Sequence, residues 1–135
     1  MANTYHQIYL QTVFAVKYRK AVIKKEWRPK LLGVIGNLIN ETNCKTIIVN
    51  GVEDHVHCLI GLRPVVSISE LMKTVKAKSS KYISDHSLTP ARFEWQEGYG
   101  VFSYSKRMWM QFISIFSIRK NIIKFKRSWK STWNY

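Results

Sequence analysis

The stretch from Gly51 to Gly61 constrains the fold of this chain more than any other segment. Its two glycines bracket a short run whose apolar members favour strands, namely Val52, Val56, Leu59 and Ile60. Side chains two positions apart on a strand lie on the same face of the sheet. The run therefore predicts a strand from which His55 and His57 project together, on the face opposite to Cys58.

Two neighbouring imidazoles on a rigid strand form half of a divalent-metal site, because imidazole nitrogens bind such cations. The acidic residues Glu53 and Asp54 directly precede this pair. The pattern His-x-His is short and common, so the alternative is one histidine in the core and one at the surface. The segments on either side of the strand favour the metal site.

These segments alternate between strand and helix patterns. Residues 5–16 are β-branched and aromatic and predict a first strand. Residues 26–43 carry apolar side chains at helical spacing, with Pro29 suited to the first turn and Asn43 to the end. Residues 45–50 predict a strand that forms a hairpin with the histidine strand around Gly51.

A second helix and a last strand complete the pattern. Ser67 and Glu70 form a capping box at the start of the helix, and residues 93–105 predict the strand. The order strand-helix-strand-strand-helix-strand is that of the split β-α-β arrangement. We therefore expect an α+β fold, an antiparallel sheet with helices packed on it in a ferredoxin-like or RRM-like sandwich, plus a C-terminal helix.

The length of 135 residues predicts one compact domain. No run approaches the roughly 18 apolar residues of a membrane span, and residues 1–5 lack the layout of a signal peptide. We therefore expect a cytoplasmic protein that has no membrane partner. Cys44 and Cys58 are predicted to be reduced and buried.

The charge points to the class of partner. The chain has 22 Lys and Arg against 8 Asp and Glu, a net charge of +14, which favours a polyanion such as nucleic acid. A structural role, with charge that serves solubility, is the alternative. All eight acids precede residue 98, whereas residues 98–135 carry eight bases.

Two basic segments are candidates for the contact with nucleic acid. The first is Lys17-Tyr18-Arg19-Lys20, which is either a solvated strand end or a set of phosphate contacts around a stacking ring. The second lies on the helix after Ser67, where bases and hydroxyls are predicted to share the solvent face and to contact phosphates. Its candidate residues are Lys76, Lys78, Ser79, Ser80 and Lys81.

Four ordered pieces of the chain resemble the small single-tyrosine transposases of bacterial insertion sequences, which are HUH nucleases, and their repeat-associated relatives. The pieces span residues 5–107. They are Lys17-Tyr18-Arg19-Lys20, Asp54-His55-Val56-His57, Lys76-Ala77-Lys78-Ser79-Ser80, and the segment from Trp95 to Ser103.

The resemblance implies metal-dependent cleavage and strand transfer of single-stranded DNA. In that family the histidine pair binds Mg²⁺ or Mn²⁺, so His55 and His57 become the metal ligands and catalytic residues. A tyrosine on a later helix attacks the phosphorus to form a 5′-phosphotyrosine link, and a Gln or His four residues on completes the metal site. The resemblance also implies a homodimer and recognition of hairpin DNA.

The chain departs from the family beyond residue 107. No tyrosine occurs between Ser105 and Asn134, so no nucleophile is identified. We therefore divide the chain into a transposase-like core, 1–107, and an atypical C-terminal segment, 108–135. The apolar residues of that segment, Phe112 to Ile123, still favour a helix. Tyr104 is interpreted as structural, and Gln111 and Asp54 are candidates for a third ligand.

A frameshift would account for the missing tyrosine. One allowed set of codons for residues 112–124 contains, in a neighbouring frame, the reading Tyr-Ile-Gln-His-Gln-Glu-Glu-His-His, which looks like the family's nucleophile helix. Genomic codons incompatible with that frame would end this hypothesis. We predict a transposase of the family that is catalytically impaired in this copy. The alternative is a non-catalytic, basic nucleic-acid-binding module with an RRM-like fold.

Overall fold

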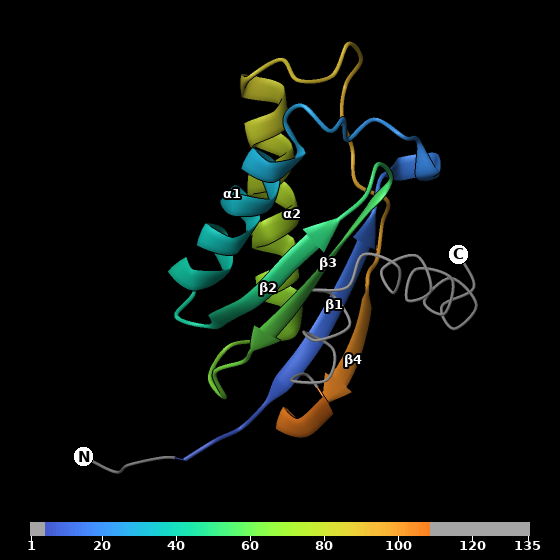
Figure 1. The fold of residues 1–135 in the computed structure, drawn as a ribbon. Helices are drawn as coiled ribbons and strands as arrows, with labels where there is room; N and C mark the ends of the chain where they lie inside the picture. The colour runs from blue at the N-terminus through green and yellow to red at the C-terminus, as the bar shows by residue number, and fades with distance from the viewer. Residues whose placement is uncertain (1–4, 109–135) are drawn as a thin grey trace.

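The described part of the chain forms a four-stranded antiparallel sheet covered on one face by two helices (Figure 1). The structure is a computed structural model, and it describes residues 5–108. In chain order the elements are β1 (Tyr9–Ala15), the 3₁₀ helix η1 (Lys17–Arg19), α1 (Arg28–Glu41), β2 (Lys45–Gly51), β3 (His55–Gly61), α2 (Ile68–Asp85) and β4 (Gly100–Tyr104).

The strands lie in the order β2-β3-β1-β4, and every neighbouring pair is antiparallel. This order and the chain order together are those of the split β-α-β arrangement, so the predicted fold class is confirmed. The predicted C-terminal helix falls in residues 109–135, outside the described residues. No helix among residues 5–108 is long and apolar enough to cross a membrane.

The hairpin of β2 and β3 holds the histidines. Its turn covers residues 52–54, and Gly51 belongs to β2, where it pairs with Val56. A side chain at Gly51 would meet the His55 carbonyl oxygen at 3.0 Å and Val56 at 3.2 Å. Only glycine therefore lets the strands approach here, which explains its place at the predicted hairpin.

The helix boundaries follow the predicted caps. Pro29 lies in the first turn of α1, and Asn43, at φ 67°, lies just beyond its end. The Ser67 hydroxyl accepts a hydrogen bond from the Glu70 amide at the start of α2. The first strand begins four residues later and ends one residue earlier than the predicted 5–16, and η1 follows directly after Val16.

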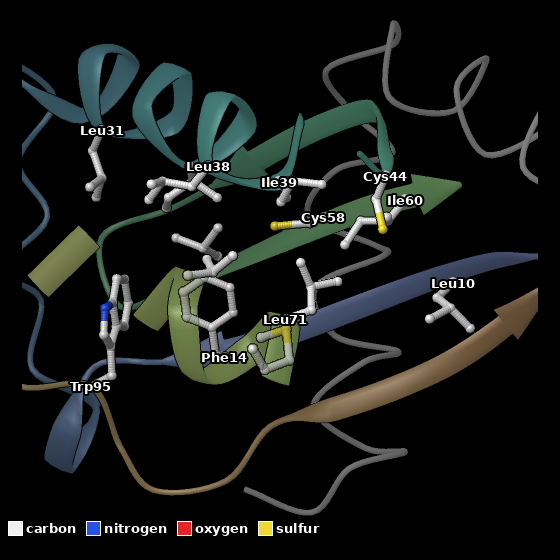
Figure 2. Packing of buried hydrophobic residues seen from close by; sticks show 14 of the residues in the cluster. Leu10, Phe14, Leu31, Leu38, Ile39, Cys44, Cys58, Ile60, Leu71 and Trp95 are labelled. Atoms are coloured by element: carbon white, nitrogen blue, oxygen red, sulfur yellow. The ribbon is translucent and has the colours of Figure 1, made fainter. Parts of the chain in front are cut away.

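The core fills the space between the sheet and the helices (Figure 2). Phe14 contacts Trp95 edge to face, with ring centroids 4.7 Å apart, and Trp95 contacts Phe93 in the same way at 4.8 Å. Both cysteines are free and buried, as predicted. Burial of the Cys58 thiol raises its pKa to about 12.

A candidate metal and nucleic-acid site

His55 and His57 project from the same face of β3, as the two-residue spacing predicts. Their ring centroids are 5.9 Å apart and the ring planes are inclined by 27°. On the neighbouring strand β1 they pair with Ala15 and Val13, respectively. Cys58 points to the opposite face, into the core. Because the two rings share a face and both are buried, the alternative of one histidine in the core and one at the surface does not hold.

Both imidazoles are nearly completely buried, with exposed fractions of 1% for His55 and 5% for His57. Desolvation, and secondarily the neighbouring His55, lowers the pKa of His57 to about 3. His57 is therefore neutral at physiological pH, which is the protonation state of a metal-binding imidazole.

Asp54 lies beside the histidines and holds one of them. Its Oδ1 is 2.7 Å from His55 Nδ1, while its Oδ2 accepts a hydrogen bond from Arg19 Nη2 at 3.2 Å. A carboxylate at Nδ1 orients the ring and leaves Nε2 for a metal. Asp54 is therefore arranged to orient His55, and its role as a third ligand stays a prediction. No group of three His, Cys, Asp or Glu side chains suited to a metal occurs within residues 5–108, and Gln111 lies outside them.

The basic turn after β1 presents an aromatic ring to solvent. Tyr18 and Arg19 have φ values of 60° and 55°, the left-handed region that non-glycine residues rarely adopt. Tyr18 is 77% exposed, and the amino groups of Lys17 and Lys20 lie 5.5 and 6.0 Å from its ring centroid. Lys17 also donates to Glu94 at 3.2 Å, and this hydrogen bond raises the Lys17 pKa.

The basic segment of α2 differs from its prediction, because part of it faces inward. Lys76 Nζ donates to the carbonyl oxygens of Gln96 and Gly98 at 2.7 and 2.9 Å. Burial lowers the pKa of Lys76. These contacts attach the chain before β4 to the helix, so the third and fourth pieces of the family resemblance, Lys76–Ser80 and Trp95–Ser103, form one structural unit.

The predicted position of Ser79 on the solvent face of α2 is wrong. Its hydroxyl is completely buried, accepts a hydrogen bond from Trp95 Nε1 at 3.0 Å and donates to the Lys76 carbonyl at 3.2 Å. The helix turns Ser79 onto the same side as Val75 and Ile83, away from the exposed Lys78. Ser80 is half-buried and donates to the Phe93 carbonyl at 3.4 Å, and Lys81 pairs at the surface with Asp85.

Two depressions bring the basic segments together. The first, here called the aromatic hollow, lies between the turn after β1 and residues 89–94 and has a volume of about 200 Å³. The second, the basic groove, runs along α2 past Lys76, Ser80 and Lys81. Both are lined by Arg92, Phe93 and Glu94. Sequence reasoning missed Arg92, because a lone base after Thr89-Pro90 carries no pattern that distinguishes it.

Tyr104 lies far from the histidine pair. It faces Tyr9 across the ladder, two strands from β3 and four residues along from the row of His57. Strand geometry therefore separates the Cα atoms of Tyr104 and His57 by about 16 Å. The Tyr104 hydroxyl donates to Gln11 Oε1 at 2.7 Å, and burial raises its pKa. Both observations agree with a structural role.

Solved structures share this fold. A crystal structure of a candidate transposase from Deinococcus radiodurans R1 matches with a TM-score of 0.70 at 20% identity, covering 87% of this chain and 94% of that one. A REP-associated tyrosine transposase bound to a REP hairpin matches with a TM-score of 0.57 at 11% identity, over 78% and 62% of the two chains.

Sequence relatives lead to the family. Transposases for insertion sequence element IS200 from Salmonella typhimurium and Salmonella typhi are each 30% identical over 80 residues, which is 59% of this chain. The match spans about half of the curated relatives, 53% of their length. The family model described as "Transposase IS200 like" matches residues 4–116. The chain therefore belongs to the family of IS200-like transposases.

Proposed function

We propose that the chain is a single-tyrosine HUH transposase protomer that binds single-stranded or hairpin DNA beside a divalent cation held by His55 and His57. The observation that carries this proposal is the joint projection of two nearly parallel imidazoles from β3, one of them neutral through burial. The hairpin bound to a structural neighbour supports DNA of that form as the partner. We also propose that two copies of this chain form a homodimer.

The residues around the pair fit a metal. The Asp54 carboxylate holds His55 through Nδ1, and Arg19 holds Asp54 from the turn after β1. His55 Nε2 and one nitrogen of His57 are therefore the proposed ligands for Mg²⁺ or Mn²⁺. When bound, such a cation withdraws charge from the scissile phosphate. Because both rings are buried, we propose that DNA reaches them after a local opening.

Strand cleavage by this chain is proposed to be impaired. A phenol has a pKa of about 10 and attacks phosphorus only where a cation lies close to it. Tyr104, at about 16 Å by strand spacing, does not meet that condition. We therefore keep the division into a core, residues 1–107, and an atypical segment, residues 108–135, in which the family's tyrosine is missing.

A non-catalytic nucleic-acid-binding module remains the second candidate function. The observation that favours it is the burial of both imidazoles, whereas Tyr18 and Lys20 are exposed to solvent. In that case DNA would bind equally well with and without a divalent cation.

Titration of the full chain with Mn²⁺, measured by isothermal titration calorimetry, tests the metal site. We expect weak binding that His55→Ala and His57→Ala abolish and Asp54→Asn weakens, about 10- to 100-fold. His86→Ala, on an exposed histidine that contacts Tyr82, is the matched control and leaves binding unchanged. Equal binding by the wild-type protein and His55→Ala would remove the metal from the proposal.

A gel assay with hairpin DNA tests the remaining parts. We expect a shifted complex that weakens steeply with salt, and no covalent adduct in the presence of Mn²⁺. Metal-dependent nicking with a protein–DNA adduct would show that the chain is active and that another group replaces the missing tyrosine. Light scattering of the free protein tests the homodimer.

A further inference from the structure

The aromatic hollow has the lining of a site for a planar ring. Its lining includes the apolar residues Val22, Pro90 and Phe93 together with the exposed Tyr18. Its volume of about 200 Å³ is below the roughly 300–1,000 Å³ of pockets for drug-sized ligands. The space therefore suits one ring system and not a larger ligand.

The backbone holds the Tyr18 ring outward against its own preference. A non-glycine residue in the left-handed region is disfavoured, and the turn contains two in succession. The Arg19 side chain turns inward to Asp54, and its amide donates to the Val16 carbonyl at 2.8 Å. Local strain of this kind concentrates at sites that bind ligands.

The charges around the hollow select an anionic chain as the carrier of that ring. Lys17, Lys20 and Arg92 line it together with one carboxylate, Glu94. Glu94 lies 3.2 Å from Lys17 and 3.8 Å from Arg92, whereas Lys20 has no carboxylate partner among residues 5–108. A phosphate next to the ring would therefore meet a cation whose charge is not already neutralised.

The position of the hollow connects it to the rest of the candidate site. On one side it shares Arg92 with the basic groove along α2. On the other side, the residue after Tyr18 is Arg19, which reaches His55 through Asp54. A nucleic-acid strand crossing this end of the sheet would therefore have the basic groove on one side of the hollow and the residues that lead to the histidine pair on the other.

We propose that the aromatic hollow takes one unpaired nucleobase of a single-stranded DNA segment, stacked on the ring of Tyr18 while Lys20 contacts the adjoining phosphate. The inference rests on the proposed binding of DNA and adds a subsite to it. A base suits the lining because every base has an apolar face, and stacking on an aromatic ring tolerates any sequence.

Fluorescence anisotropy of the full chain with a DNA hairpin carrying a single-stranded extension tests the subsite. Tyr18→Ala should weaken binding about 5- to 150-fold, and Tyr18→Phe should leave it within about twofold, because stacking needs the ring and not the hydroxyl. Tyr5→Ala removes another exposed tyrosine, outside the hollow, and should have no effect. Circular dichroism checks that each variant is folded.

A series of probes with one abasic site each completes the test. One position in the extension should weaken binding by wild-type protein as much as Tyr18→Ala does, and the variant should lose nothing more at that position. Equal binding by the wild-type protein and Tyr18→Ala on every probe would overturn the subsite alone. A Tyr18→Ala loss that no abasic site reproduces would mean a backbone contact, and would also overturn it. A wild-type protein that binds no probe would overturn the proposed function as well.

Discussion

The turn Lys17–Arg19 with Lys20 and the α2 segment Lys76–Lys81 look alike in the sequence, yet the fold uses them differently. Both are short, basic and predicted to contact phosphates. In the turn, Tyr18 and Lys20 remain directed outward. In α2, Lys76 and Ser79 face inward and hold the chain that leads to β4. Basic and hydroxyl side chains that lie near buried hydrogen-bonding groups therefore stabilise the fold. The composition of a segment does not show whether its side chains make such internal contacts or face a ligand.

The largest effect expected from this difference concerns Lys76. Lys76→Met should lower the free energy of unfolding by about 2–3 kcal/mol, because two carbonyl oxygens lose a charged donor. The exposed Lys78 is the matched control, and Lys78→Met should change stability by less than about 0.5 kcal/mol. Urea unfolding measures both. Equal losses in the two variants would mean that the contacts of Lys76 do not stabilise the fold.

A smaller loss is expected at Ser79. Ser79→Ala leaves the Trp95 indole N–H buried without its acceptor, so the free energy of unfolding should fall by about 1–2 kcal/mol. The neighbouring exposed Ser84 provides the control Ser84→Ala. A folded, fully stable Ser79→Ala protein with weakened DNA binding would reverse this assignment and return Ser79 to the binding surface.

Lys20 should affect binding and leave stability unchanged. Lys20→Ala should reduce the slope of log affinity against log salt by about 0.7–0.9, the value for one phosphate contact. Lys25→Ala, on an exposed base outside both depressions, should leave the slope unchanged. Anisotropy at several salt concentrations measures the slope. If the Lys20→Ala variant keeps the wild-type slope, Lys20 makes no phosphate contact, and the difference from Lys76 disappears.

The smallest expected effect is a gain in stability on replacement of Tyr18. Tyr18→Gly removes the steric penalty of φ 60°, partly offset by the greater freedom of glycine in the unfolded chain, so stability should rise by up to about 1 kcal/mol. Tyr18→Ala keeps the penalty and should show no such gain. Thermal unfolding compares the two. A loss of stability in Tyr18→Gly would indicate that the ring contributes more to folding than the left-handed backbone costs.

What could be predicted from the sequence was local. The common face of His55 and His57 follows from alternation within one strand, and the cap of α2 from a spacing of three residues. The pairings that decide the site are distant in sequence. Arg19 reaches Asp54 across 35 positions, and Lys76 reaches Gly98 across 22. No periodicity encodes such contacts, which is why Asp54 is a candidate ligand in the sequence. Ser79 is a different case, because it lies four residues after Val75 and four before Ile83, and helical spacing therefore places it on the buried side.

The left-handed turn also escaped prediction, and for a different reason. Such backbone is expected at glycine, and Tyr18 and Arg19 are neither glycine nor asparagine. The turn is held by contacts with distant parts of the chain, Arg19 with Asp54 and Lys17 with Glu94. Its presence could be found only once the strands that carry those partners were in place.

The alternation of β3 also has a consequence for which metal the proposed site would choose. A thiolate next to two imidazoles is a strong ligand set for zinc. Cys58 follows His57 directly, yet its sulfur lies on the other side of the sheet, in the core, as a thiol whose pKa burial raises to about 12. The alternation of the strand therefore keeps the Cys58 sulfur away from the two imidazoles. Among the described residues, the proposed site therefore offers a cation no cysteine sulfur, the ligand that would favour zinc.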